Sequence, residues 1–283
     1  MIFLSSKKFF IAVFFTILFS LNLFAGQNNF EIAYEVSSYT YKEPHMDYPI
    51  SLKSTKQGAS VLLKNYGFAG QEKSFYLLEL RYMTGANTYN GWLSGGGGVY
   101  TPLEASGIKD YYFEGALKAG KIFYEQNNFQ VEGSVGLGYR WLKDNLQDIG
   151  NGGYLRQSQY FYVPFEADFK YNLTQYIKMT LKTELDWLIS GEQYSGKIVG
   201  YTDSTSVNHT QEQGYGLRAS LKFSSLVWGS MEFFVEPFWR YWHIQNSNEG
   251  YQYVQYGGTW YQQTTYEPFN TTQEYGVKVG LAF

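Results

Sequence analysis

The last ten residues of the chain alternate strictly between apolar side chains and polar or small ones. The apolar positions are Tyr275, Val277, Val279, Leu281 and Phe283. Between them lie Glu274, Lys278 and three small residues. Successive side chains of a β-strand point to opposite faces, so this segment is expected to be a strand with one apolar and one polar side. A strand of this kind fits between an apolar and a polar environment.

The first 25 residues have the pattern of an export signal. Lys7 and Lys8 precede an apolar run from Phe9 to Leu21, and Ala25 supplies the small residue of a cleavage site. The run is short for a membrane-spanning helix. We therefore expect a signal peptide over residues 1–25 and one domain over residues 26–283. The chain has no cysteine, which excludes disulfides, thiol catalysis and lipid attachment through a thiol.

Nine other segments repeat the alternation, which makes ten expected strands. They cover residues 29–41, 57–68, 73–86, 109–123, 128–142, 157–170, 176–189, 212–224, 229–244 and 273–283. Short and long connections alternate between them, as periplasmic turns and extracellular loops do in outer-membrane barrels. An aromatic content of 20% suits girdles of Tyr and Trp at two membrane interfaces. We therefore expect an all-β fold, a ten-stranded antiparallel transmembrane β-barrel with short periplasmic turns and long extracellular loops.

An exported soluble β-sandwich or a lipocalin-like barrel is the alternative fold. A lipocalin keeps an apolar interior for its ligand, whereas here the charged side chains share one strand face and the apolar ones the other. The register of the second strand is ambiguous, because Val61, Leu62 and Leu63 are consecutive. Pro164 and Pro237 lie inside expected strands and indicate bulges or bends.

With the apolar face turned outward, nearly every charge of the strands points inward. The resulting lumen charge network comprises Glu31, Glu35, Glu79, Arg81, Glu114, Lys118, Glu132, Arg140, Glu166, Asp168, Lys182, Glu184, Asp186, Arg218, Lys222, Glu232, Glu236, Arg240, Glu274 and Lys278. Lys64, Lys170 and Lys178 join it, which gives 12 acidic and 11 basic side chains. Because unpaired charge away from water is costly, near-equal numbers favour ion pairs across the strands. Ten strands lie close to the size that side chains fill, so we expect a polar, largely plugged lumen.

The export signal, the alternating strands and the closing segment Tyr275–Phe283 resemble the porin-family or outer-membrane β-barrel proteins of Gram-negative bacteria. The resemblance covers essentially the whole mature length and implies location in the bacterial outer membrane. It also implies contact with outer-membrane lipid and lipopolysaccharide, and recognition of Phe283 by the barrel-assembly machinery. We expect a monomer, and the net charge of −3 gives no reason to expect a nucleic-acid partner.

Ten strands with long outer loops also resemble the omptins, outer-membrane proteases that use acidic residues and a His–Asp pair on their loops. The candidates are His45, Asp47, Glu104, Asp203, His209 and His243. Asp203 and His209 are six residues apart, and the second loop offers only Glu104, so the acidic pair of the omptins is missing. No motif links Ser190 to His243 in the manner of an outer-membrane phospholipase. We therefore expect no enzymatic activity, no catalytic residues, no metal site and no cofactor.

The fifth outer loop, residues 245–272, combines tyrosine with glutamine and glycine and carries almost no charge. Its candidate contact residues are Tyr251, Tyr253, Tyr256, Trp260 and Tyr261. Tyrosine with small polar neighbours makes adaptable contact surface and also suits sugar stacking. The alternating tyrosines also suit a hairpin that extends the ninth and tenth strands beyond the membrane, and we favour that interpretation.

Three functional hypotheses follow from the sequence. The first is a non-enzymatic integral outer-membrane β-barrel with a plugged lumen and surface-exposed contact loops. The second is a narrow porin-like passive channel for small solutes, and the third is an omptin-like hydrolase. Conductance in a planar bilayer separates the first two, and replacement of the three histidines tests the third.

Overall fold

The computed structural model describes residues 28–44, 47–67, 70–94 and 100–283. The expected signal peptide and His45 lie outside these residues. Among the described residues, no helix has the length and apolar character needed to cross a membrane.

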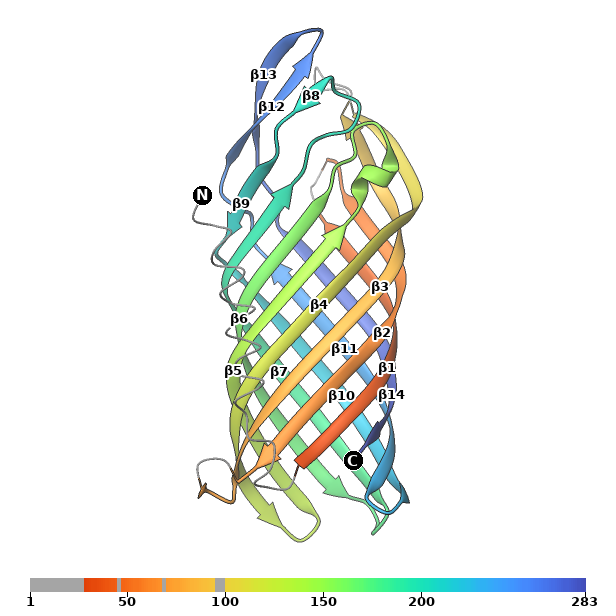
Figure 1. The fold of residues 1–283 in the computed structure, drawn as a ribbon, viewed down its shortest axis with the longest axis vertical. Coiled ribbons are helices and arrows are strands. Elements are labelled where there is room, and N and C mark those ends of the chain that lie inside the picture. The colour runs from red at the N-terminus through yellow and green to blue at the C-terminus, as the bar shows by residue number, and fades with distance from the viewer. Residues whose placement is uncertain (1–27, 45–46, 68–69, 95–99) are drawn as a thin grey trace.

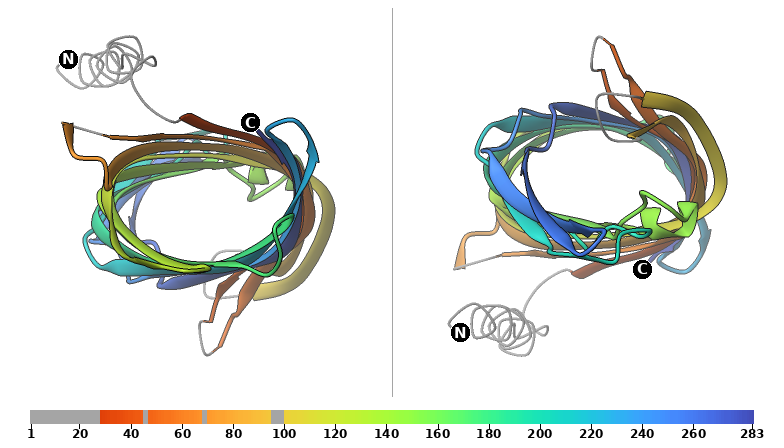
Figure 2. Two further views of the ribbon diagram at one scale, coloured as in Figure 1. Left: turned by 90° about the horizontal axis from the view of Figure 1, so that it is seen from below. Right: turned by 90° about the horizontal axis from the view of Figure 1, so that it is seen from above.

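Ten long antiparallel strands pair edge to edge into a ring, seen from the side in Figure 1 and along its axis in Figure 2. They are β1 (Asn28–Glu43), β2 (Ile50–Tyr66), β3 (Ser74–Ser94), β4 (Tyr100–Gln126), β5 (Phe129–Asp144), β6 (Arg156–Asn172), β7 (Ile177–Ser195), β10 (Gly214–Trp228), β11 (Met231–Ile244) and β14 (Asn270–Ala282). The pairings β1–β14 and β7–β10 join strands β1 to β7 to the group of β10, β11 and β14 and so complete the ring. The all-β antiparallel fold expected from the sequence is thereby confirmed.

The two ends of the ring differ. At one end, which we call the turn end, residues 127–128 and 229–230 form two-residue turns. Asn127 has a φ of 52°, the positive value that a tight hairpin turn requires. At the other end, the loop end, β12 (Gly250–Tyr256) and β13 (Thr259–Thr265) form a hairpin that stands beyond the ring (Figure 1).

Further elements at the loop end were not expected as separate strands. β9 (Val207–Gln211) pairs with the outer part of β7, and β8 (Asp203–Ser204) adds to the β12–β13 hairpin as a three-stranded sheet. A short 3-10 helix, η2 (Leu146–Ile149), follows β5. The fifth loop is thus a hairpin, as favoured from its alternation, but it belongs to a second sheet and does not extend β11 and β14.

Two expected outer loops are mostly strand. Residues 42–56 and 86–108 were expected to be loops, yet β2 begins at Ile50 and the β3–β4 pairing continues to Ser94 and Tyr100. The outer parts of β2, β3 and β4 lack one continuous apolar face. Apolar alternation therefore predicted strands that end too early. The connection between β1 and β2 is therefore short, contrary to the expectation of long outer loops throughout.

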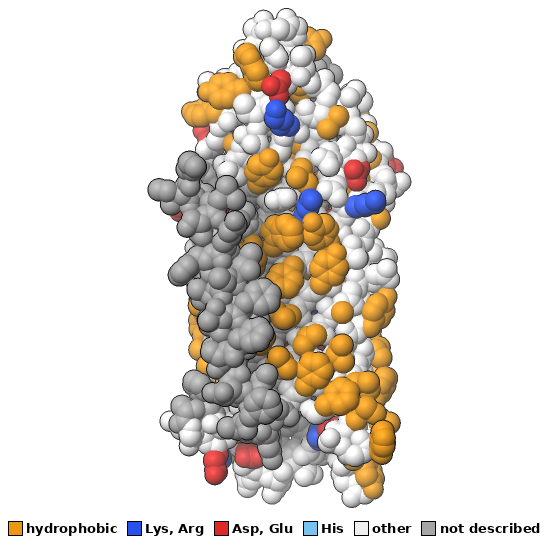
Figure 3. All heavy atoms as spheres, in the orientation of Figure 1, with side chains coloured by type: hydrophobic (Ala, Val, Ile, Leu, Met, Phe, Trp, Pro, Cys, Tyr) orange, Lys and Arg blue, Asp and Glu red, His pale blue; other side chains and the backbone are white. Residues whose placement is uncertain are grey.

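The strand register turns apolar side chains outward and charges inward. On β14, Tyr275, Val277 and Val279 are exposed, while Glu274 is buried. On β2, Lys56 and Lys64 are both buried, which fixes the ambiguous register. Figure 3 shows the hydrophobic side chains covering much of the outer wall.

Pro164 and Pro237 each interrupt the strand pairing on one side. The β5–β6 ladder lacks partners at Pro164, and the β10–β11 ladder lacks them at Pro237, because proline has no amide hydrogen to donate. The pairing on the other side of each proline continues, with Asp186 opposite Pro164 and Val277 opposite Pro237.

Candidate functional site: the charged lumen

A layer of four arginines crosses the middle of the ring. This arginine layer consists of Arg81, Arg140, Arg218 and Arg240 with the carboxylates of Glu35, Glu114, Asp186 and Glu274. The Arg81 Nη1 lies 2.5 Å from Glu114 Oε1, and its Nε lies 3.2 Å from Glu35 Oε1. Arg218 also pairs with Glu114, and its Nε lies 2.6 Å from Asp186 Oδ2. Equal numbers of opposite charges share the layer, so each ion has at least one counter-ion although most of these side chains are buried.

Aromatic rings fill the space between these ions. The guanidinium of Arg140 lies 5.0 Å from the ring centre of Tyr112 and 5.3 Å from that of Trp242, and the guanidinium of Arg240 lies 3.8 Å from that of Phe238. The Tyr112 hydroxyl donates a hydrogen bond of 2.8 Å to Glu274 Oε2. Cavities beside the layer measure only about 30 and 50 Å³, room for a few waters.

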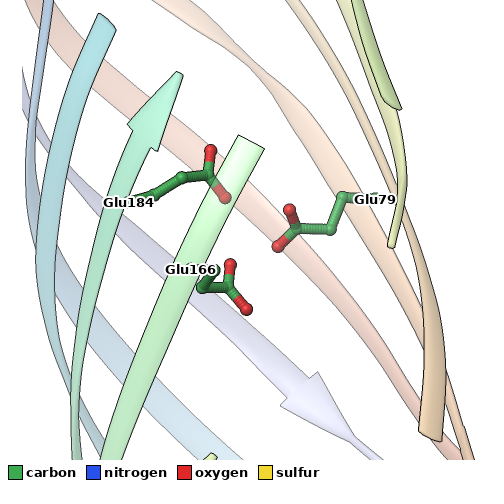
Figure 4. Close-up of side chains that lie close together, drawn as sticks. All are labelled: Glu79, Glu166 and Glu184. Atoms are coloured by element: carbon green, nitrogen blue, oxygen red, sulfur yellow. The ribbon is translucent and has the colours of Figure 1, made fainter. Parts of the chain in front are cut away.

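Closer to the turn end than the arginine layer, Lys118 forms ion pairs with three carboxylates. Glu79, Glu166 and Glu184 bring carboxylate oxygens within 4.8 Å of one another. Figure 4 shows the three side chains converging inside the ring. The Lys118 Nζ lies 2.7 Å from Glu79 and 2.6 Å from Glu166, and it also pairs with Glu184. The three carboxylates could ligate a metal by their spacing, but the Lys118 ammonium is already their common counter-ion.

At the turn end the lumen widens into a cavity of about 570 Å³. We call it the lysine chamber, because Lys64, Lys170, Lys178, Lys182 and Lys222 are among its lining residues. The ion pairs here are local: Lys170 lies 2.7 Å from Glu132, which also pairs with Lys64, and Lys222 lies 2.6 Å from Glu31. Asp168 and Glu232 also line it, so the chamber carries both signs of charge.

The loop end holds a buried cluster that the sequence analysis missed. Arg156 lies 3.0 Å from Glu43, 3.0 Å from Asp144 and 3.7 Å from Glu267. The Tyr41 hydroxyl donates hydrogen bonds to Glu43 at 2.7 Å and to Glu267 at 3.0 Å. Burial and the neighbouring Glu43 carboxylate together raise the pKa of Glu267 to about 8, although Arg156 opposes the shift.

Lys56 and Asp110 form a second missed pair at the same end, with Asn87 donating to Asp110 at 2.8 Å. Asp110 lay within an expected strand, and Lys56, Asp144 and Arg156 each lay within two residues of one. Continuing the inward register of these strands would have found all four. The position of Glu267 could not be predicted from the strand register, because the residue lies in the connection between β13 and β14, which belong to different sheets.

The hydrolase candidates are dispersed. His209 is buried, with Nε2 3.3 Å from Thr265 Oγ1, and burial lowers its pKa. Asp203 instead pairs with Lys197 at 2.8 Å, on the exposed surface. The His243 ring faces outward between Tyr215 and Phe269, while Asp47 and Glu104 are exposed. The structure therefore does not bring His209 and Asp203 together as a catalytic pair.

No sequence-family model matches the chain, and no curated protein matches it. Among solved structures, the outer membrane protease OmpT from Escherichia coli has a TM-score of 0.62 at 9% identity, covering 90% of this chain and 96% of that one. The outer membrane protein OprG from Pseudomonas aeruginosa has a TM-score of 0.36 at 10% identity, covering 91% of this chain and 95% of that one. The chain resembles an outer-membrane β-barrel protein, and at 9% identity this likeness to OmpT is one of fold.

Proposed function

We propose that this chain is a non-enzymatic integral protein of the bacterial outer membrane, with a lumen closed by ion pairs and with outer loops that make surface contacts. The turn end then faces the periplasm and the loop end faces outward. The observation that carries the proposal is the arginine layer, which spans the ring and leaves cavities of only about 30 and 50 Å³ beside it.

The height of the apolar wall supports the membrane placement. On β14, aromatic Tyr275 and Phe283 flank the outward aliphatic residues Val277, Val279 and Leu281. Eight residues of strand span about 27 Å, which strand tilt reduces to about 21 Å along the barrel axis. This height is close to the apolar band of about 25 Å on outer-membrane barrels. Phe283 at the end of this strand remains our candidate for recognition by the barrel-assembly machinery.

A closed lumen predicts that the protein does not conduct ions. In planar lipid bilayers the purified protein should give no reproducible conductance steps. The double variant Glu114→Ala/Arg218→Ala removes two partners from the arginine layer and should give steps, since their atoms bridge the centre of the lumen. The matched variant Lys178→Ala/Glu232→Ala removes an ion pair at the wide turn end and should stay silent. Regular steps from the unaltered protein would favour the narrow channel instead.

An omptin-like hydrolase is the competing function that the fold likeness to OmpT raises. Its test is peptide cleavage by the purified protein, with His45, His209 and His243 replaced together by alanine in a parallel sample. Cleavage that disappears in the triple variant would overturn the non-enzymatic proposal.

A further inference from the structure

The β12–β13 hairpin has a composition unlike the rest of the molecule. Residues 250–265 contain five aromatic side chains and four glutamines but no Asp, Glu, Lys, Arg or His. The hairpin stands beyond the ring in Figure 1, and Figure 3 shows hydrophobic side chains on this end of the molecule. At this position the hairpin is accessible to molecules that approach the loop end.

The strand register sorts these side chains onto two faces. Side chains of directly opposed residues share a face, and Tyr253 is opposite Gln262 while Gln255 is opposite Trp260. We call this set the platform; it consists of Tyr251, Tyr253, Gln255, Trp260 and Gln262. Tyr256 and Tyr261 belong to the other face, together with Gln252 and Val254.

The two faces differ in how far they are covered: the platform rings are all exposed, whereas the other face is partly buried, although its Tyr256 and Tyr261 are exposed. On the other face Val254 is buried, and Gln252 donates a hydrogen bond of 2.8 Å to the Thr205 carbonyl. On the platform, the exposed fractions of Tyr251, Tyr253 and Trp260 are 58%, 42% and 47%. From Tyr251 to the level of Gln255 the strand covers roughly 14 Å, so three rings follow one another along one face of the hairpin.

We propose that the platform binds a neutral polysaccharide chain. This inference rests on the proposed orientation, in which the loop end faces outward. Aromatic rings offer flat apolar faces to the C–H groups of a sugar, and tyrosine and glutamine offer donors and acceptors to its hydroxyls. A chain of sugars can contact the three rings in succession.

The charge pattern favours a neutral partner over an anionic one. The nearest ionised residue in the sheet is Asp203, opposite Gln255, and the Lys197 ammonium already neutralises it at 2.8 Å. An anionic partner would therefore lose hydration without gaining an ion pair, and Glu249, an exposed carboxylate one residue before the hairpin, would repel it. An apolar protein surface would prefer aliphatic contacts, but Val254, the only aliphatic side chain of the hairpin, is buried on the opposite face.

The test measures binding of dextran, amylose, galactomannan and cellohexaose to the full-length protein in detergent micelles, by calorimetry. We expect at least one of these neutral probes to bind, and Tyr253→Ala and Trp260→Ala to weaken that binding by about fivefold to tenfold each. Tyr256→Ala and Tyr261→Ala are the matched controls on the opposite face of the same hairpin, and they should change affinity by less than about twofold.

Three outcomes would overturn the inference: no binding of any of the four probes, equal losses from both faces, or tighter binding of the anionic polymer polygalacturonate. Dimerisation that Trp260→Ala abolishes would assign the platform to a second copy of the chain instead. None of these results changes the conductance of the barrel, so the closed lumen is tested separately.

Discussion

The middle of the lumen and its turn end contain the same kinds of charge in different packing. In the middle, Arg81, Arg218 and Arg240 each reach carboxylates on two or more strands, and only small cavities adjoin them. At the turn end, lysines such as Lys170 and Lys222 pair locally around a cavity of about 570 Å³. Charge balance alone therefore does not close a barrel.

The shape of the cation accounts for the difference. A guanidinium is planar, presents several donors in fixed directions and stacks on aromatic rings, so one arginine can bridge carboxylates and pack against Tyr or Trp. An ammonium is a compact point charge on a flexible stem, and it pairs without filling a cross-section. Lys118 is the exception, because three carboxylates converge on it next to the arginine layer.

The largest expected effect comes from removing the carboxylate that the arginines share. Glu114→Ala leaves Arg81 and Arg218 with excess buried positive charge, and we expect a loss of about 3–5 kcal/mol in the free energy of unfolding. Urea unfolding in lipid vesicles, followed by tryptophan fluorescence, measures it. The control is Glu232→Ala at the chamber rim, which should cost about 0–1 kcal/mol. Equal losses would end the distinction between the two regions.

Exchanging cation type tests whether shape or charge matters. Arg218→Lys keeps the charge but loses the contacts to Glu114, Asp186 or both, so we expect a loss of about 1–3 kcal/mol. The reciprocal change, Lys222→Arg, has open chamber beside it and should cost less than about 1 kcal/mol. The same unfolding assay compares the two variants. A tolerated Arg218→Lys would mean that charge balance is sufficient.

At the loop end, Arg156 lies among three carboxylates, those of Glu43, Asp144 and Glu267. The stability of this region is therefore expected to depend on pH. Glu267 faces Glu43, Arg156, Tyr41 and Tyr154, and its pKa is raised to about 8 by burial and then by Glu43. Because the pKa of Glu267 is higher in the folded protein than its value of 4.5 in the unfolded chain, proton binding stabilises the fold. This contribution is complete below pH 4.5 and is lost as the pH rises through about 8.

We therefore expect the free energy of unfolding to decrease between pH 5 and 8 by up to about 1.4 kcal/mol per pH unit relative to Glu267→Gln, which cannot ionise. Unfolding titrations of both proteins at pH 5.5, 7 and 8.5 give the comparison. Glu249→Gln, on an exposed neighbour in the same loop, should keep the slope of the unaltered protein. Parallel pH profiles for the unaltered protein and Glu267→Gln would contradict the assignment.

The smallest effect is expected at the rim of the chamber. Lys178 is half exposed and pairs with the partly exposed Glu232, so water screens both ions. Lys178→Ala should change the free energy of unfolding by about 0–1 kcal/mol. A loss as large as that of Glu114→Ala would show that the chamber depends on its ion pairs as much as the middle does.

The inward register was accessible from the sequence because it repeats every two residues. The closing segment places Glu274 and Lys278 on one face, and the structure has both inside the ring. Strand ends were less accessible, because beyond the apolar wall both faces of a strand become polar. Lys56 and Arg156 were missed for that reason, and both lie close to the ends of the expected strands.

Some arrangements depend on residues that are far apart in the chain. The pair of Arg240 and Glu35 joins positions separated by 205 residues, and Tyr112 reaches Glu274 across 162. Alternation assigns each of these side chains to the inside but not to a partner. The two faces of the β12–β13 hairpin likewise differ only through tertiary contacts, because Val254 is buried and Gln252 donates a hydrogen bond to the Thr205 carbonyl.

The sequence by itself determined the all-β fold, the outward apolar face and the inward charges, because a strand carries its own two-residue period. Only the tertiary structure decided which charges meet, where the lumen narrows and which face of the hairpin packs against the neighbouring loop. These features follow from the height and rotation of each strand around the ring, and strand pairing sets both at once for the whole barrel.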